Sequence, residues 1–139
     1  MKRILEVEMG ITMAILFLAS LGAYFFYWYS TIWFFDMPMH FIGGYFICIA
    51  LMYVTGYRLH ATGYKGEDKD VIKKNNHKYF YLKLILLTFI IGLLWEVYEY
   101  VVDLYFGNHL VVLIDSFSDL CFDTAGAITA LFFIDKYML

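Results

Sequence analysis

Eight ionisable side chains in this chain are spaced so that they could form one site. They make up three sets: Asp36 with His40; Glu96 with Glu99 and Asp103; and Asp115 with Asp119 and Asp123. Neighbours within each set are three or four residues apart, so each set lies along one face of its own helix. Because each set also reaches similar depths from one helix end, we expect the three faces to line a common cavity.

The chemistry of such a cavity is that of a divalent-metal site. No Lys or Arg occurs at 4–57 or 84–135, where all eight residues lie. Unpaired carboxylates repel one another, and either protonation or a multivalent cation relieves the repulsion. Oxygen ligands with one imidazole suit Mg²⁺, Mn²⁺, Ca²⁺ or Zn²⁺. We predict one or two ions held by this set, with Glu99 and Asp119 as the catalytic residues and no other cofactor.

Simpler interpretations exist for single members of the set. An acid at the end of a membrane span is commonly a solvated group, and this applies most to Asp36, Asp103 and Asp115. Asp115 could instead be the N-cap of the last helix, and a lone His40 could be a hydrogen-bonded packing residue. The deeper acids, which share their faces with one another, do not fit the interpretation as solvated groups: Glu96, Glu99, Asp119 and Asp123.

The elements that position these residues are predicted to cross a membrane. Of the 139 residues, 63% are hydrophobic and 22% aromatic, and the mean hydropathy is +0.68. A soluble domain of this size cannot bury so much apolar surface. Residues 10–35 contain 26 positions without a charge, whereas a span needs about 20. The sequence therefore predicts an all-α integral membrane protein with a single domain.

Four spans are expected, at about 8–34, 37–57, 79–104 and 115–136, with a polar loop at 58–78. Residues 109–114 are apolar and are expected to be a short re-entrant or interfacial piece. With both termini in the cytoplasm, all ten Lys and Arg residues fall on the cytoplasmic side, as the positive-inside rule requires. The acidic sets then lie at the opposite face. Cys48 and Cys121 are expected to be buried thiols.

Two known groups of membrane proteins share these motifs. Asp36-x3-His40-Phe41, followed by Gly44-Tyr45-Phe46, resembles the first motif of VanZ-like proteins. "WEVYE" at 95–99 with Asp103, and the Asp115, Asp119 and Asp123 series leading into "DTAGA", resemble the YjdF-like group of small bacterial inner-membrane proteins. The resemblance implies a helical bundle in that membrane whose acidic motifs share a site. VanZ-like chains usually carry a basic residue and an Asn near the last motif, where this chain has Asp123, which argues against transferring the VanZ function.

Three functions are consistent with this pattern. The first is a metal-dependent hydrolase or phosphotransferase acting on a lipid or lipid-linked substrate at the extracytoplasmic face. The second is a cation or proton transport or channel element that uses the acidic cluster. The third is a non-catalytic assembly module. The expected partners are membrane lipids and a second copy of the chain, whereas the pI near 5.7 and the net charge of −3 argue against nucleic acid.

Overall fold

In the computed structural model, the backbone is described at 2–61, 69–106 and 113–138, and side chains at 3–55, 78–102, 104–105 and 115–136. The described backbone forms these helices: α1 (Lys2–Phe26), α2 (Trp28–Thr31), α3 (Asp36–Ala61), α4 (Lys69–Phe106) and α5 (Leu113–Met138). Four stretches are long and apolar enough to cross a membrane: Arg3–Phe26, Asp36–Thr55, Lys78–Val102 and Asp115–Lys136. The predicted all-α fold with four membrane spans is confirmed.

Large apolar side chains cover the outside of these helices. Phe17, Leu94 and Phe132 are 65%, 62% and 70% exposed, respectively. A soluble monomer rarely presents so much contiguous apolar surface, whereas the hydrocarbon of a bilayer accommodates it. The exposed surface thus agrees with the composition in indicating a membrane protein.

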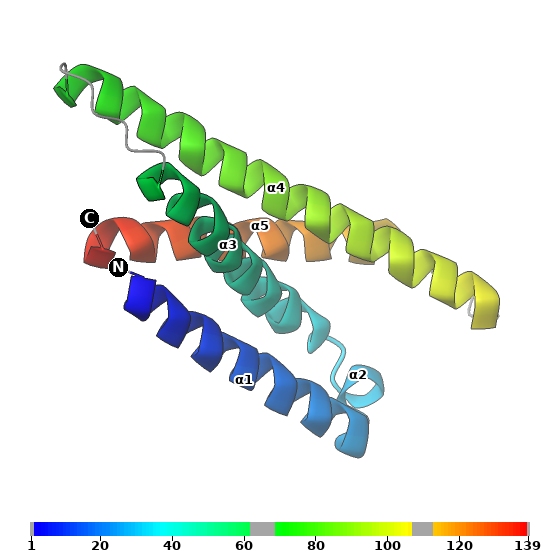
Figure 1. The fold of residues 1–139 in the computed structure, drawn as a ribbon. Helices are drawn as coiled ribbons and strands as arrows, with labels where there is room; N and C mark the ends of the chain where they lie inside the picture. The colour runs from blue at the N-terminus through cyan, green and yellow to red at the C-terminus, as the bar shows by residue number, and fades with distance from the viewer. Residues whose placement is uncertain (1, 62–68, 107–112, 139) are drawn as a thin grey trace.

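The first span was predicted to end near residue 34, but its helix ends at Phe26. Tyr27 adopts the left-handed conformation, with φ 55° and ψ 38°, and this conformation commonly ends an α-helix. The hydroxyls of Ser30 and Thr31 donate hydrogen bonds to the Tyr27 carbonyl, at 2.9 and 3.0 Å. The short α2 therefore forms a hydrogen-bonded turn that leads the chain into α3 (Figure 1).

The segment predicted as a polar loop at 58–78 is helical at both ends, although the apolar stretches stop at Thr55 and resume at Lys78, close to the predicted span bounds. Helix α3 continues to Ala61, and α4 already begins at Lys69. Residues 69–91 contain neither Gly nor Pro, and polar side chains alone do not end a helix. The first helix begins at Lys2, six residues before the predicted start of the first span. The remaining boundaries agree within two residues: α3 carries Pro38 in its first turn, α4 ends directly before Gly107, and α5 begins at Leu113. Most of the segment predicted as re-entrant, 109–112, lies outside the described residues.

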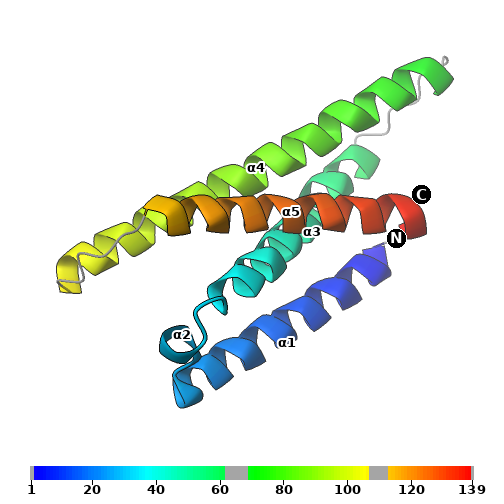
Figure 2. The ribbon, with the colours of Figure 1, turned by 180° about the vertical axis from the view of Figure 1, so that it is seen from behind.

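Helix α3 is the centre of the bundle. It packs most extensively on α5, while α1 lies against α3, and α4 lies against both α5 and α3. Both termini are at the end of the bundle where α3 ends and α4 begins (Figures 1 and 2). The acidic ends of α3 and α5 therefore lie at the opposite end of the molecule.

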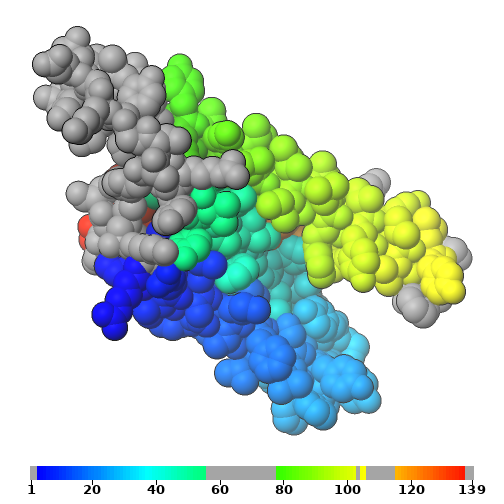
Figure 3. All heavy atoms as spheres, viewed as in Figure 1, coloured from blue at the N-terminus to red at the C-terminus, as the bar shows by residue number. Residues whose placement is uncertain are grey.

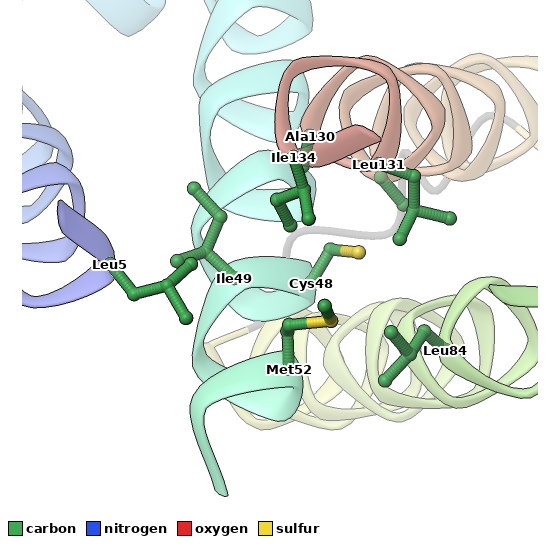
Figure 4. Close-up of a cluster of buried hydrophobic side chains, with 9 residues drawn as sticks. Leu5, Cys48, Ile49, Met52, Leu84, Ala130, Leu131 and Ile134 are labelled. Atoms are coloured by element: carbon green, nitrogen blue, oxygen red, sulfur yellow. The ribbon is translucent and has the colours of Figure 1, made fainter. Parts of the chain in front are cut away.

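A buried apolar core fills the half of the bundle nearer the termini. Cys48, Ile49 and Ile134 are fully buried there, and Leu84 is 1% exposed (Figure 4). Burial of Cys48 agrees with the sequence prediction, but Cys121 is exposed on α5. The exposure of Cys121 could not be predicted, because the apolar residues around it in the sequence do not show which face of α5 is buried.

Two glycines allow α3 and α5 to approach closely. A Cβ on Gly44 would collide with the backbone carbonyl of Asp123, and a Cβ on Gly126 would collide with the Phe41 carbonyl. Glycine at such crossings lets helix backbones approach in a membrane. This close crossing brings Asp123 against the first turns of α3.

Candidate metal centre

His40 lies at the centre of a group of carboxylates contributed by three helices. Its Nδ1 is 3.4 Å from Oδ2 of Asp123. Its Nε2 faces three further oxygens, at 3.8 Å from Asp36 Oδ1, 3.9 Å from Glu96 Oε1 and 4.0 Å from Asp119 Oδ2. The three acidic faces that the sequence predicted therefore converge, and they converge on this imidazole.

Most of these side chains are withdrawn from solvent. The side chains of Asp119 and Asp123 are 4% and 5% exposed, and those of His40 and Glu96 are 8% and 9% exposed. Asp36 is 34% exposed and lies at the mouth of the group. Several carboxylates are thus held in a low-dielectric environment, with one imidazole among them and no Lys or Arg among the described groups of the site.

Glu96 has an oxygen that the fold leaves unsatisfied. Among the described side chains, Oε1 of Glu96 is buried and has no hydrogen-bond partner. Leaving a buried polar atom unpaired typically costs about 1–3 kcal/mol, and each such atom in a native structure needs an explanation. Because this oxygen lies 3.9 Å from His40 Nε2, it is directed into the acidic group.

Glu99 and Asp119 have hydrogen-bond partners of their own. The indole Nε1 of Trp95 donates to Oε1 of Glu99 at 2.8 Å, one turn along α4. The Ser118 hydroxyl donates to the Asp115 carbonyl at 2.8 Å and makes only a longer approach, of 3.4 Å, to Oδ1 of Asp119. The orientation of Glu99 is therefore restricted by a neighbour on its own helix, whereas that of Asp119 is restricted only weakly.

Two overlapping sets of side chains have the geometry to hold a cation. Ligand atoms from Asp36, His40 and Asp119 lie within 4.8 Å of one another, and so do those from His40, Glu96 and Glu99. His40 belongs to both sets. The geometry therefore accommodates one ion beside the imidazole and leaves carboxylates for a second position.

A glycine on α4 makes room for the carboxylate of Asp123. A Cβ on Gly92 would collide with Oδ2 of Asp123, whereas a Cβ on Gly43 of α3 would lie 4.0 Å from Oδ1, which is ordinary van der Waals contact. Asp123 thus fits into a slot between α3 and α4 that a larger residue at position 92 would close. The sequence gave no reason to single out Gly92.

The acidic group opens into a cavity of about 580 Å³ between α1, α3 and α4. Asp36, His40, Glu99 and Asp123 line one part of it. Apolar side chains from the same three helices line the rest: Leu16, Phe46, Ile47, Ile91 and Leu94. Figure 3 shows α1 and the second half of α4 diverging on either side of α3. A ligand that reaches the acids would also contact an apolar wall.

Tyr29 belongs to the mouth of this cavity, although the sequence gave no reason to select it among thirteen tyrosines. Its partial burial, with the negative charges of Asp36 and Glu99, raises the pKa of its phenol above the usual value. The phenol is therefore neutral at physiological pH and can donate a hydrogen bond to an anionic ligand or a carboxylate.

The structure does not bring all eight predicted residues together. Asp36, His40, Glu96, Asp119 and Asp123 form the group, and Glu99 adjoins it. Asp115 lies in the first turn of α5 with an exposed side chain and belongs to neither ligand set, although its charge acts on Asp36 and Asp119. It is not an N-cap, because the helix already begins at Leu113. The side chain of Asp103 lies outside the described residues.

Comparisons with known proteins place the chain in a family. No curated protein and no solved structure matches it. Residues 3–138 match the family described as "Predicted membrane protein (DUF2238)", which is nearly the whole chain. That description agrees with the four apolar helices found here. The chain therefore belongs to the DUF2238 family of membrane proteins.

Proposed function

We propose that this protein binds a divalent metal ion at His40 and uses it to hydrolyse or transfer a phosphoryl group of a lipid or lipid-linked substrate. The observation that carries the proposal is the convergence of three carboxylates on Nε2 of His40, with the buried Oε1 of Glu96 unpaired. A cation satisfies this oxygen and offsets the charge repulsion in the group.

The distances fit an ion. Metal bonds to nitrogen and oxygen are about 2.0–2.2 Å long, so two ligand atoms on opposite sides of one ion lie about 4 Å apart. The separations of 3.8–4.0 Å between His40 Nε2 and the oxygens of Asp36, Glu96 and Asp119 are within this limit. Asp36 and Asp119 belong to one candidate ligand set with His40, and Glu96 belongs to the other.

Asp123 is assigned a different role from the ligand role expected from the sequence. It contacts Nδ1 of His40, not Nε2. A carboxylate that accepts a hydrogen bond from the second ring nitrogen of a ligating histidine fixes its tautomer and orientation. Asp123 therefore directs Nε2 of His40 toward the other carboxylates.

Glu99 is the proposed general base. A bound divalent ion supplies Lewis acidity and lowers the pKa of water. Glu99 lines the cavity, and the Trp95 indole holds one of its oxygens at 2.8 Å, which leaves the other oxygen to accept a proton from a nucleophile. Asp119, 4% exposed beside His40, is the proposed ligand that orients the reacting group.

The catalytic proposal is tested by turnover on lipid phosphates. Purified protein loaded with Mn²⁺ or Zn²⁺ is incubated with a series of lipid phosphates, and both released phosphate and remaining lipid phosphate are measured. We expect Glu99→Gln to abolish turnover while metal binding persists. Val97→Ala is the control, because Val97 lies on the exposed face of the same helix. A metal-loaded wild-type protein that neither releases phosphate nor consumes any lipid phosphate in the series would refute the catalytic part of the proposal.

Cation transport is less well supported. The helices beyond the site, toward the termini, are closed by buried apolar side chains that include Ile49, Leu84 and Ile134. Thr88 is a fully buried polar side chain among them, and its hydroxyl donates to the Leu84 carbonyl at 3.0 Å. Within the described residues, no charged side chain continues the cavity through this core. Metal-dependent ion flux in liposomes that Asp119→Asn abolishes would favour transport instead.

The orientation and the closer family relationship are also part of the proposal. Both termini lie at one end of the bundle, and the basic residues of the sequence favour the cytoplasm for that end. The acidic group then faces the outside of the membrane. The motif resemblance to YjdF-like and VanZ-like proteins supports a bacterial inner membrane as the location, and association of two copies stays a prediction.

A further inference from the structure

We propose that the apolar part of the cavity is a groove for one hydrocarbon chain of a phosphate-bearing lipid, which enters sideways from the outer leaflet between α1 and α4. This inference rests on the proposed function, because the metal centre holds the phosphate. The inference adds to that function the route by which the substrate enters the site and the residues that select it.

The cavity has the two-part chemistry of an amphiphile. Its acidic part contains His40 and Glu99, and its apolar part contains Leu16, Ile47 and Ile91, one from each of three helices. A small polar substrate would use only the first part. A head group joined to a hydrocarbon chain fills both parts.

The depth of the apolar part matches one leaflet. Leu16 lies ten residues before the end of α1, and Ile47 lies eleven residues after the start of α3. At 1.5 Å per residue, both positions are about 15 Å from the outer ends of their helices. The hydrocarbon core of a bilayer is about 30 Å thick, so the groove extends to about its midplane.

The groove is accessible from the membrane. Helices α1 and α4 both pack on α3 but make no extensive contact with each other. On α4, the lining residues Leu94, Trp95 and Tyr98 are 62%, 52% and 58% exposed. On α1, Ser20 is exposed and also lines the cavity. These side chains form the rim of a lateral opening through which a chain passes without leaving the hydrocarbon.

The charge of the site selects the head group. Five carboxylates surround the head-group end, and no Lys or Arg among the described side chains lines the cavity. An anionic head group is repelled by the acids alone and is bound only through the ion. Attachment of the phosphate is therefore metal-dependent, which separates this lipid from neutral or cationic lipids.

Photocrosslinking tests the groove in the wild-type protein. The protein in a maltoside detergent is mixed with lysophosphatidic acid that carries a diazirine at the end of its chain, with Mn²⁺ or with EDTA. A monoacylglycerol with the same chain is the matched probe without phosphate. We expect the phosphate probe with Mn²⁺ to label peptides containing Leu16, Ile47 and Ile91, and EDTA to reduce this labelling about tenfold, the equivalent of 1.4 kcal/mol of head-group binding.

Two variants of α1 extend the test. Ser20→Trp fills the opening and should abolish labelling of the groove. Leu18 is 64% exposed on α1 and does not line the cavity. Leu18→Trp should therefore leave labelling unchanged. Equal labelling by both probes, labelling by the phosphate probe that EDTA does not reduce, or full labelling in Ser20→Trp would each overturn the inference.

The results also separate the groove from the proposed function. Metal binding without groove labelling refutes the groove and leaves the metal centre intact. Groove labelling without release of phosphate or consumption of the lipid phosphate refutes the hydrolase or phosphotransferase and leaves the groove intact.

Discussion

Gly43 and Gly44 are adjacent in α3 but meet very different surroundings, and the same substitution at each tests how the site is assembled. A Cβ on Gly44 would collide with the backbone carbonyl of Asp123. A Cβ on Gly43 would have only Oδ1 of Asp123 nearby, at 4.0 Å, which is ordinary van der Waals contact. We therefore predict that Gly44→Ala is disruptive and that Gly43→Ala is tolerated.

The size of the effect follows from the contact. Because carbon and oxygen atoms pack at about 3.5–4.0 Å, Gly44→Ala requires α3 and α5 to separate by about 1 Å or more. Overpacking of this kind costs about 1–3 kcal/mol, partly offset by the helix propensity of Ala, about 1 kcal/mol better than Gly. The Nδ1–Oδ2 distance between His40 and Asp123 is already 3.4 Å, so the same separation breaks that contact.

Unfolding by titration with a denaturing detergent, followed by circular dichroism, measures the free energy of unfolding. Gly44→Ala should lower it by about 0–2 kcal/mol relative to the wild type, and by about 1–3 kcal/mol relative to Gly43→Ala, which shares the gain in helix propensity. Gly44→Ala should also weaken metal binding, whereas Gly43→Ala should leave metal binding unchanged and the stability unchanged or slightly raised. If Gly44→Ala unfolds at the same denaturant fraction as Gly43→Ala and binds metal equally well, the close crossing of α3 and α5 is refuted.

Three further predictions concern other parts of the molecule. Asp123→Asn should weaken metal binding about 10- to 100-fold without abolishing it, because the side chain orients His40 rather than binding the ion; isothermal titration with Zn²⁺ measures this, and complete loss of binding would make Asp123 a ligand. A thiol-reactive maleimide should modify Cys121 in the folded protein and spare the fully buried Cys48; mass spectrometry of the labelled peptides reads this out, and equal modification would contradict the packing of α3. Two reporters are fused to the C-terminus in turn, one active only in the cytoplasm and one active only outside it. The cytoplasmic reporter should be active; activity of the other reporter alone would contradict the proposed orientation.

The convergence of the acids was predictable from the sequence because helical periodicity and depth are local properties. Asp36 and His40 share a face since they are four residues apart, and the same holds for Asp119 and Asp123. Spans of an up-and-down bundle place equal depths side by side, so the three sets had to meet if their faces turned inward. The structure shows that they do.

The roles within the group were not predictable, because they depend on helix rotation and separation. Asp119 and Asp123 have the same spacing and chemistry, yet one faces Nε2 and the other Nδ1 of His40. The tight crossing at Gly44 and Gly126 places α5 against α3, and it is a contact between distant parts of the chain that the spacing within one helix does not reveal.

The left-handed Tyr27 was also missed. Neither Gly nor Pro marks the turn, and a tyrosine with positive φ is uncommon. The first helix ends at this left-handed residue, and the hydroxyls of Ser30 and Thr31 donate to its carbonyl in the turn that follows. That turn delivers Tyr29 to the mouth of the cavity, which explains why no periodic signal identified it.

The central claim is that Glu96 and the carboxylates around His40 hold a divalent ion, and elemental analysis of the purified protein tests it most directly. The protein is loaded with Mn²⁺ or Zn²⁺, freed of excess metal and analysed beside Glu96→Gln, with Glu6→Gln, at the far end of α1, as the control for a carboxylate outside the site. We predict about one ion or more per chain, lost in Glu96→Gln and retained in Glu6→Gln. Metal well below one ion per chain in the wild-type protein, unchanged by Glu96→Gln, would contradict the claim.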